Sequence, residues 1–408
     1  MHFLKYKKKN FCIDNLSIGK LSKKFETPIY CYSLSQIRYN IKSFKKSFNK
    51  VNPLICFSVK ANANVNILNE LKNNGCGADV VSIGELIIAL KAGISPSKIV
   101  FSGVGKTARE LKFAIKKKIL LINIESESEA VLINKISANL SKKTSVGIRL
   151  NPNIDSKTLK KITTGLNENK FGLTKASCLN LIKKFKTYKN LELNCLSVHI
   201  GSQILEIDPF KKTLKVIGDI IKKSKYQFKF IDLGGGMGIP YERGKKKLNL
   251  SRYNFLVKNF ISKFKCKIIF EPGRFIIGNT AGLITKIIYI KETPKKNFII
   301  LDAGMNDLMR PALYESKHLI LPSKKNKKIQ TKETEFVGPI CESADKFLNV
   351  KKYQILKEND FLVILDVGAY GMSLASNYCF RPKPAEILIN KSRVKLIRKK
   401  ESINKLIS

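Results

Sequence analysis

The apolar positions between residues 54 and 270 fall into eight short runs rich in β-branched side chains. The runs are LICFSV (54–59), ADVV (78–81), KIVFS (98–102), LLINI (120–124), TSVGIRL (144–150), LSVHI (196–200), FKFIDL (228–233) and KIIF (267–270). Longer amphipathic stretches separate them, such as VNILNELKNNG (65–75), which ends on a glycine suited to cap a helix. Strands that alternate with helices predict a parallel sheet, and eight units in roughly 220 residues favour a closed (β/α)₈ barrel. An open doubly wound sheet is the alternative, because the pattern alone does not prove closure.

The pattern changes after residue 280. Strand-like runs follow with little helical periodicity between them, namely GLITKIIYI (282–290), NFIILDAG (297–304), FLVILDVGAY (361–370) and AEILINKSRVKLI (385–397). We therefore predict an α/β barrel domain over residues 31–280 and a second, all-β domain over residues 281–408. Residues 1–30 show no helical period, and their pattern is compatible with strands added to either domain.

The composition is that of a globular protein with an unusual charge. The chain has 408 residues, 44% of them hydrophobic, and 76 basic against 31 acidic residues give a net charge of +45. Such an excess can indicate nucleic acid or an anionic membrane as partner. Here the positive charges are spread over the whole length and do not alternate with aromatic residues, which favours a compositional bias of surface positions.

The cysteines and the apolar segments indicate where the protein works. Nine cysteines are scattered without a CxxC or Cys/His spacing, which argues against a disulfide framework and a structural zinc site and favours a reducing compartment. No apolar stretch is long enough to span a bilayer, and the N-terminus has no signal-peptide pattern. We expect a cytoplasmic protein without a metal.

Polar residues follow the apolar runs at four predicted strand ends, where the active sites of barrels form. Lys60 follows LICFSV, His199 lies near the end of LSVHI, glycines 234–236 follow FKFIDL, and Glu271 and Arg274 follow KIIF. Each feature alone is compatible with a structural role. Together they meet the needs of pyridoxal phosphate, which requires a lysine for a Schiff base, amides for its phosphate and an anion at its ring nitrogen.

Seven motifs now carry a resemblance to a known family. FSVKAN, HIGSQ, DLGGGMGIPY, EPGR, MNDLMRPALY, CES and DVGAYGMSLASNYCFRP occur in that order, and the chain resembles the meso-diaminopimelate decarboxylase family. These are barrel-type pyridoxal-phosphate enzymes related to alanine racemase and ornithine decarboxylase. The resemblance implies a barrel followed by a β domain that residues 1–30 join. It also implies decarboxylation of meso-2,6-diaminopimelate to L-lysine and carbon dioxide, the last step of lysine biosynthesis, by a homodimer with shared sites.

The resemblance also implies roles for individual residues. Lys60 corresponds to the Schiff-base lysine, His199 to the residue stacked on the ring, and Cys341 to the acid that protonates the carbanion. The implied cofactor-binding residues are Lys60, His199, Ser202, Gly235, Gly236, Glu271, Gly273, Arg274 and Tyr370. The implied substrate-binding residues are Arg274, Arg310, Tyr314, Glu342 and Tyr370. A thiol is a suitable proton donor, and a guanidinium at Arg310 suits the far carboxylate of the substrate.

Two alternatives and two departures accompany this interpretation. Ornithine or arginine decarboxylation is the alternative on the same fold, although an arginine aimed at the far end would repel a bare cation. A binding-only pyridoxal-phosphate protein is the alternative from another class, and such proteins tend to lack a second domain.

The chain departs from the family pattern at two places. The family usually has a smaller residue such as alanine in place of Ser58. Segment 157–172, which resembles the loop that closes over the site, begins with lysines where the family's version differs.

Overall fold

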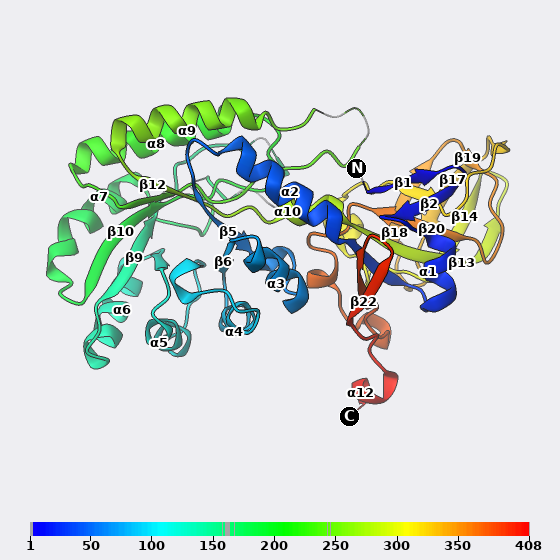
Figure 1. Ribbon diagram of the computed structural model, residues 1–408, viewed down its shortest axis with the longest axis horizontal. Coiled ribbons are helices and arrows are strands. Elements are labelled where there is room, and N and C mark those ends of the chain that lie inside the picture. Colours follow the sequence, from blue (N-terminus) through cyan, green and yellow to red (C-terminus); the bar gives the residue numbers. More distant parts are fainter. Residues whose placement is uncertain are drawn as a thin grey trace. The chain divides into compact units, whose positions relative to one another are not determined.

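The structure is a computed structural model that describes residues 3–156, 158–159, 164–166, 168–242, 244 and 246–407. The chain forms two compact units, which we call the barrel unit and the β unit (Figure 1). The barrel unit contains Ile41–Ile239 and Lys246–Phe275, and the β unit contains Met1–Asn40, Pro240–Lys245 and Ile276–Ser408. The predicted domain boundaries after residues 30 and 280 remain a prediction.

The barrel unit is built on eight parallel strands that close on themselves in the order β10-β11-β12-β5-β6-β7-β8-β9. The strands are β5 (Leu54–Ser58), β6 (Gly77–Val80), β7 (Ile99–Phe101), β8 (Leu121–Ile124), β9 (Thr144–Arg149), β10 (Leu191–Ser197), β11 (Phe230–Asp232) and β12 (Lys267–Phe270). Closure is made where β12 pairs with β5, with Ile269 opposite Leu54. The predicted closed barrel is therefore confirmed, and the open doubly wound alternative is wrong.

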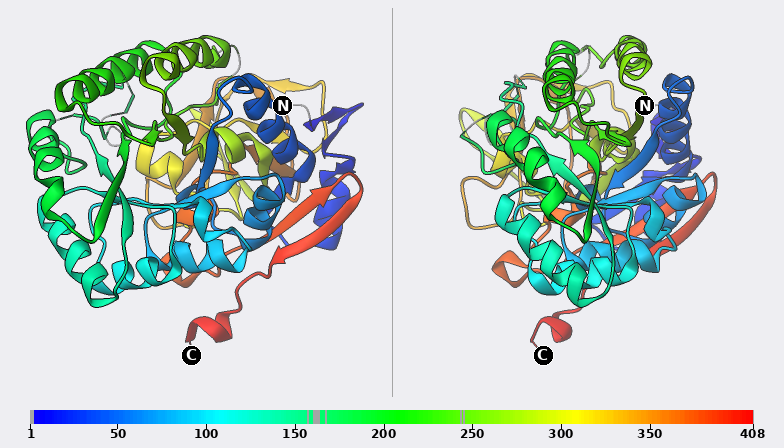
Figure 2. Two further views of the ribbon diagram at one scale, coloured as in Figure 1. Left: turned by 60° about the vertical axis from the view of Figure 1, so that its left-hand side comes forward. Right: turned by 90° about the vertical axis from the view of Figure 1, so that its left-hand side faces the viewer.

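Helices form the outer layer of the barrel, as Figures 1 and 2 show. They are α3 (Val65–Asn73), α4 (Ile83–Lys91), α5 (Ala108–Lys117), α6 (Glu127–Asn139), α7 (Lys175–Lys184), α8 (Asp208–Ser224) and α9 (Leu250–Phe264), and α2 (Leu34–Ser47) precedes β5. Local capping starts several of them. At α5 the Thr107 side chain accepts the N–H of Glu110, and the Glu110 carboxylate accepts the N–H of Thr107. This reciprocal pair satisfies two amide groups that the first turn leaves without helical partners.

The β unit is dominated by a nine-stranded sheet. Its strands are β4 (Ile29–Ser33), β13 (Ala281–Glu292), β14 (Lys296–Leu301), β15 (Ile320–Pro322), β17 (Glu333–Val337), β18 (Lys346–Val350), β20 (Phe361–Leu365), β21 (Ala385–Asn390) and β22 (Arg393–Arg398). The long strand β13 pairs with β4, β14 and β20, and β4 also pairs with β21. The chain's two ends therefore meet in one sheet, and this all-β second part confirms the predicted fold class.

Smaller elements complete the β unit. They are β1 (Leu4–Lys7), β2 (Asn10–Ile13), β3 (Leu16–Ser17), β16 (Ile329–Gln330) and β19 (Tyr353–Gln354), with helices α1 (Ile18–Lys24), α11 (Arg310–Tyr314) and α12 (Ile403–Ile407). Helix α10 (Arg274–Ile277) begins in the barrel unit and ends in the β unit. β1, β2 and β3 form a separate antiparallel sheet whose apolar side chains pack with those of β4 and β20. The predicted strand-like run 385–397 is in fact the hairpin β21–β22, because Lys391, with φ of 56°, turns the chain back on itself.

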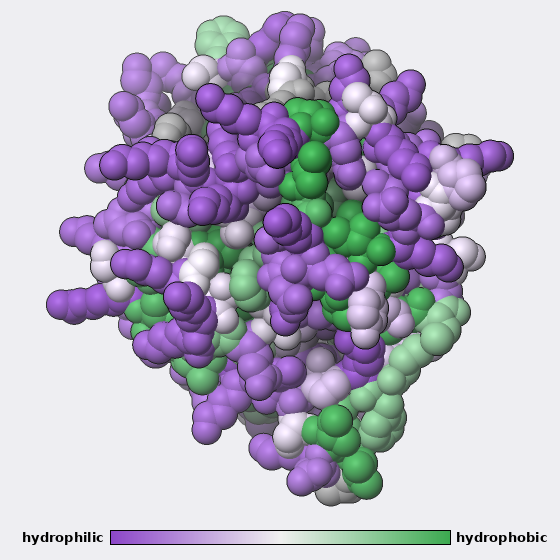
Figure 3. All heavy atoms as spheres, turned by 90° about the vertical axis from the view of Figure 1, so that its right-hand side faces the viewer, coloured by the Kyte–Doolittle hydropathy of each residue, from purple (hydrophilic) through white to green (hydrophobic). Residues whose placement is uncertain are grey.

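The surface reflects the high lysine content. The face drawn in Figure 3 is mostly hydrophilic, with separate groups of hydrophobic side chains among the polar ones. Helix α12 carries two of the exposed large hydrophobic residues, Ile403 and Ile407. None of the helices in the described ranges combines the length and the apolar character that a bilayer span requires.

Candidate active site

Lys60 lies at the carboxyl end of β5, where the strand pattern predicted it. It is the central residue of a short 3-10 helix, Val59–Ala61, that begins directly after the strand. Its Nζ is 3.7 Å from Oδ2 of Asp79, a buried residue of β6, and the same oxygen accepts a hydrogen bond of 2.6 Å from Ser58. The Lys60 side chain is 38% exposed. The amine is thus held beside a buried carboxylate and is still accessible from solution.

Glu271 follows β12 and is buried within the barrel unit. Its side chain hydrogen-bonds with that of Asp232 at the end of β11. Burial, followed by the negative charges of Asp232 and Asp79, raises the pKa of Glu271 well above its ordinary value. Glu271 Oε1 is buried and, among the described residues, has no hydrogen-bond partner. A buried oxygen without a partner is rare, and a protonated pyridine nitrogen would satisfy this one.

The glycine-rich turn 234–236 connects Asp232 and Glu271 through backbone contacts. The Gly234 N–H donates to Asp232 Oδ1 at 2.9 Å, and the Glu271 N–H donates to the Gly234 carbonyl at 2.8 Å. A Cβ at Gly235 would lie 2.3 Å from the Glu271 carbonyl oxygen, so no larger residue fits there. Gly236 has φ of +84°, a conformation that glycine favours. Such turns present backbone N–H groups, which suit a phosphate.

The EPGR motif (271–274) lies in the same region of the barrel unit. A Cβ at Gly273 would lie 2.9 Å from the Cβ of Ala61, so the loop after β12 packs directly on the turn that carries Lys60. Arg274 is buried, and its Nη2 donates to Ser202 Oγ at 3.0 Å. The barrel unit therefore brings together Lys60, the glycine turn, Glu271 and the Arg274–Ser202 pair at the carboxyl ends of its strands.

His199 is oriented by the same glycine turn. Its Nδ1 accepts the N–H of Gly235 at 3.2 Å, so Nδ1 carries no proton. Burial, followed by the positive charges of Lys60 and Arg149, holds the pKa of His199 well below its ordinary value. The ring is therefore neutral. The run 196–200 was predicted as the strand, but β10 begins at Leu191 and ends at Ser197, which places His199 in the loop after the strand.

Cys341 and Glu342 lie in the β unit, in the turn between β17 and β18. Both are exposed. The turn is fixed by Asp345, a buried residue whose carboxylate accepts the N–H groups of Met305 and Ile340, each at 2.7 Å. The Glu342 carboxylate accepts a hydrogen bond from the Tyr378 hydroxyl. The thiol is thus exposed to solvent on a turn whose backbone is fixed by the buried Asp345 carboxylate.

Arg310 begins helix α11 and is buried within the β unit. Its Nη1 donates to Nε2 of His318 at 2.7 Å, and its guanidinium lies 4.6 Å from the centre of the Tyr241 ring. His318 Nδ1 donates to a backbone carbonyl, so His318 is a neutral acceptor. Tyr314 ends α11 and is partly buried, and Tyr370 is partly buried with φ of 57°.

Parts of the predicted closing loop, segment 157–172, lie outside the described residues, namely positions 157, 160–163 and 167. The expectation about loop closure therefore stays a prediction. Within this segment the described residue Thr164 contacts the site, because its Oγ1 donates to the His199 carbonyl at 2.8 Å.

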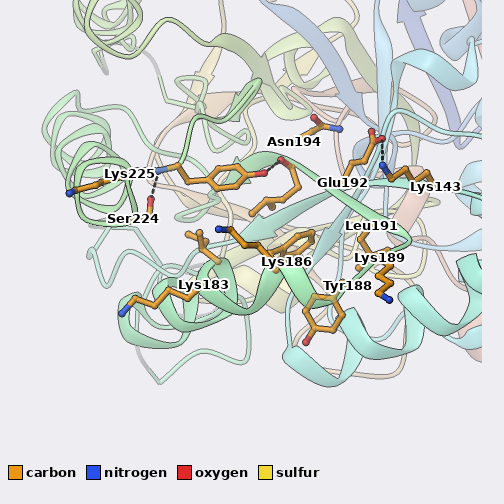
Figure 4. A pocket seen from close by; sticks show the side chains of 14 residues that line it. Lys143, Lys183, Lys186, Tyr188, Lys189, Leu191, Glu192, Asn194, Ser224 and Lys225 are labelled. Atoms are coloured by element: carbon orange, nitrogen blue, oxygen red, sulfur yellow. Dashed lines mark hydrogen bonds and ion pairs between the residues drawn. The ribbon is translucent and has the colours of Figure 1, made fainter.

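A separate cavity of about 800 Å³ lies at the opposite, amino-terminal end of the barrel strands (Figure 4). None of the predicted site residues lines it. Its lining includes five lysines, Lys143, Lys183, Lys186, Lys189 and Lys225. Lys143 pairs with Glu192, and the Lys183 and Lys225 side chains point away from the other labelled residues. Helices α7 and α8 end here, and positive side chains at helix carboxyl ends complement the helix dipole.

Sequence reasoning missed Asp79 and Asp232, the two buried carboxylates next to Lys60 and Glu271. A signal was present, because each is an acidic residue within an apolar strand run, ADVV or FKFIDL. An ionisable side chain in such a run is rarely buried without a partner. Asp79 and Asp232 therefore indicate that other polar side chains lie near the carboxyl ends of these strands.

A closed barrel that carries a lysine, a neutral imidazole and a buried, partly unsatisfied glutamate at one end is the architecture of the barrel-type pyridoxal-phosphate enzymes. Comparison with known proteins agrees with this class. Residues 34–278 match the family model described as "Pyridoxal-dependent decarboxylase, pyridoxal binding domain".

Similar proteins narrow the class further. The chain is 38% identical to a diaminopimelate decarboxylase of Aquifex aeolicus, covering 99% of this chain and 96% of that protein. It is 41% identical to one of Helicobacter pylori, covering 95% and 96%. A crystal structure of diaminopimelate decarboxylase from Helicobacter pylori, complexed with L-lysine, has a TM-score of 0.90, 40% identity and coverage of 95% and 98%.

The chain belongs to the pyridoxal-dependent decarboxylase family and, within it, to the diaminopimelate decarboxylases. This confirms the predicted family, the predicted decarboxylase activity and pyridoxal phosphate as the cofactor.

Proposed function

We propose that this chain converts meso-2,6-diaminopimelate to L-lysine and carbon dioxide at a site that holds pyridoxal phosphate. The observation that carries the proposal is the buried Glu271 Oε1, which has no partner in the described part of the chain and lies in the barrel that presents Lys60. The full-length similarity to diaminopimelate decarboxylases supports the substrate. A relative of known structure binds L-lysine, the product of this reaction.

The barrel unit would hold the cofactor, which supplies an electron sink for the negative charge left at the α-carbon. Lys60 would bind it covalently through Nζ, and Glu271 would pair with its ring nitrogen. The neutral His199 would lie against the ring face, where a charged imidazole would disfavour a protonated ring. Backbone amides of Gly235, Gly236 and Gly273, with the Arg274 guanidinium and the Ser202 hydroxyl, would bind the phosphate, and Tyr370 would complete this set.

The β unit would supply the residues for the substrate. Arg310, Tyr314 and Tyr370 would bind its carboxylates together with Arg274 of the barrel unit, and the Glu342 carboxylate would bind the distant ammonium. The Cys341 thiol would donate its proton to the α-carbon after carbon dioxide has left. Because Cys341 and Glu342 are exposed in the chain by itself, we expect that water must be excluded from them before they act efficiently.

We also propose a cytoplasmic homodimer with active sites shared between subunits. Its support is that the cofactor residues and the proton donor lie in different compact units, and that a partner chain can exclude the water that reaches Cys341. A two-fold dimer would make two equivalent sites of this kind. All nine cysteines are free thiols in the structure, in agreement with a reducing compartment.

The test is an assay of the purified protein with pyridoxal phosphate. With meso-diaminopimelate we expect L-lysine and carbon dioxide in equal amounts, and no reaction with ornithine, arginine or lysine. The positive charge of Arg310 is the physical reason, since a cationic substrate end has no carboxylate to pair with it. Comparable rates with ornithine would show that the far end of the substrate is read differently.

A further inference from the structure

The pair formed by Asp232 and Glu271 has a property that neither carboxyl group has alone. Asp232 and Glu271 are buried at the ends of neighbouring strands, β11 and β12, and their side chains hydrogen-bond with each other. Two carboxyl groups that share one buried hydrogen bond cannot both be ionised without strong repulsion. One proton between them removes the repulsion and provides the donor that the hydrogen bond needs.

The surroundings place that proton on Glu271. Asp232 is the better stabilised anion, because its Oδ1 accepts the Gly234 N–H at 2.9 Å and its Oδ2 lies 3.4 Å from both Ser197 Oγ and Asn123 Nδ2. Glu271 Oε1 has no such donor among the described residues. The pKa shifts agree with this order, because burial raises the pKa of both groups, while their shared hydrogen bond lowers the pKa of Asp232 and raises that of Glu271.

The other ionisable groups around the pair do not reverse this order. Lys60 favours an ionised Glu271, and Asp79 opposes ionisation of both members. Three more groups face the pair from the surrounding elements, namely Cys56 of β5, Cys195 of β10 and Tyr253 of α9. Burial and the nearby carboxylates raise the pKa of each of these three, so they stay neutral and add no charge.

We propose that Asp232 is a positioning residue that keeps a proton on Glu271 in the cofactor-free barrel, and that this proton passes to the cofactor's ring nitrogen on binding. The inference rests on the proposed pairing of Glu271 with that nitrogen. Glu271 gives up the proton that it shares with Asp232, an N–H bond forms at the ring, and the free Oε1 of the resulting carboxylate accepts that N–H. Glu271 becomes the carboxylate that the protonated ring requires, and no proton is taken from solution for this step.

The same transfer explains the geometry of the turn. Once Glu271 is ionised, the positive charge of the protonated ring, whose N–H Glu271 accepts, offsets the repulsion between the two carboxylates. Asp232 keeps the Gly234 N–H and the hydroxyl and amide donors. The Gly234 contact also joins Asp232 to the turn that would bind the phosphate. A single buried carboxylate therefore prepares the partner of the ring nitrogen and fixes the turn beside it.

The experiment counts protons taken up when pyridoxal phosphate binds, by titration calorimetry in two buffers of different ionisation heat. The Asp232→Asn amide can donate to Glu271 and favours its carboxylate before binding. We expect this variant to take up about one more proton than the native protein at the same pH. Asp219→Asn, which removes an exposed carboxylate on α8, should match the native protein. Other protonation changes of the cofactor cancel in this comparison.

Three outcomes are distinct. Equal proton counts for the native protein and Asp232→Asn, with the visible absorbance of the bound cofactor present in both, would overturn the inference and leave the proposed function intact. A native protein that binds the cofactor without this absorbance would contradict the proposed function itself. If Asp232→Asn does not fold, infrared difference spectra of the native protein decide. A protonated carboxyl band must disappear on cofactor binding and be missing in Glu271→Gln, and its persistence in the native protein would overturn the proposal.

Discussion

The cofactor-binding core of the barrel unit and the Cys341 turn of the β unit differ in their exposure to solvent. Glu271, Arg274 and Asp232 of the barrel unit are buried and held by contacts within that unit. Cys341 and Glu342 of the β unit are exposed on a turn. The difference indicates a division of tasks. The barrel unit is preorganised for the cofactor, which reduces the ordering that binding requires. Cys341, the proposed proton donor, and Glu342, which would bind the substrate ammonium, still need to be shielded from water.

The largest effect that separates the two units is expected from Lys60→Ala. Without the amine no covalent bond to the cofactor forms, so the visible absorbance of the bound cofactor and the activity should both disappear while the fold survives. Absorbance spectra, turnover and circular dichroism measure the three. Lys186→Ala, which removes an exposed lysine at the opposite end of the same barrel, is the control and should behave as native. A Lys60→Ala variant that keeps the band and turns over would contradict the assignment.

Cys341→Ala should affect catalysis without affecting the cofactor. A positioned acid contributes roughly 10²–10⁴-fold to a rate, so we expect kcat to fall by that factor while the absorbance band stays native. Cys379, the other exposed cysteine, provides the matched control, and Cys379→Ala should keep near-native kcat. If both variants lose the same activity, or neither does, Cys341 has no special role in proton transfer.

Arg310→Ala should mainly weaken substrate binding. Loss of one member of a buried charge pair removes roughly 2–5 kcal/mol, which should appear in KM for meso-diaminopimelate and leave cofactor affinity unchanged. Arg310→Lys keeps the charge but not the two-pronged geometry, and it should recover part of the loss. An Arg310→Ala variant that binds the cofactor more weakly and the substrate normally would show that Arg310 acts on the cofactor and not on the substrate.

Asp345→Ala tests whether the turn of the β unit must be rigid. The buried carboxylate accepts two backbone N–H groups, and each one left unsatisfied costs about 1–3 kcal/mol. Urea denaturation should therefore show a less stable protein, and kcat should decline because Cys341 is less well placed. Asp345→Asn retains an acceptor oxygen and should be milder. Equal kcat in all three proteins, measured where each is folded, would separate the turn from catalysis.

The sequence predicted the fold well where strand ends coincide with chemistry. Lys60 and Glu271 both follow strands that end within one residue of the predicted limit, because apolar β-branched runs are bounded by the polar residues that the site needs. The predicted strand limits were wrong where the continuous apolar run covered only part of the strand. β10 starts five residues before its predicted run, since its first half alternates exposed and buried positions and lacks a continuous apolar signal.

The buried partners of the site were harder to predict than the site itself. Asp79 lies beside Lys60 because β6 pairs in parallel with β5, and Asp232 lies beside Glu271 because β11 pairs in parallel with β12. Residues 21 and 39 positions apart in the chain, such as Ser58 and Asp79 or Asp232 and Glu271, give no local pattern that joins them. Register and closure are properties of the whole sheet and have to be seen in three dimensions.

The most direct test of the division between the units is to mix the two inactive variants Lys60→Ala and Cys341→Ala under conditions that exchange subunits. If each site combines the barrel unit of one chain with the β unit of its partner, a mixed dimer has one site with both lesions and one with none. Random exchange should then restore about a quarter of native activity, because half of the dimers are mixed and each has one intact site. No recovery, with subunit exchange demonstrated independently, would mean that each chain builds its own site.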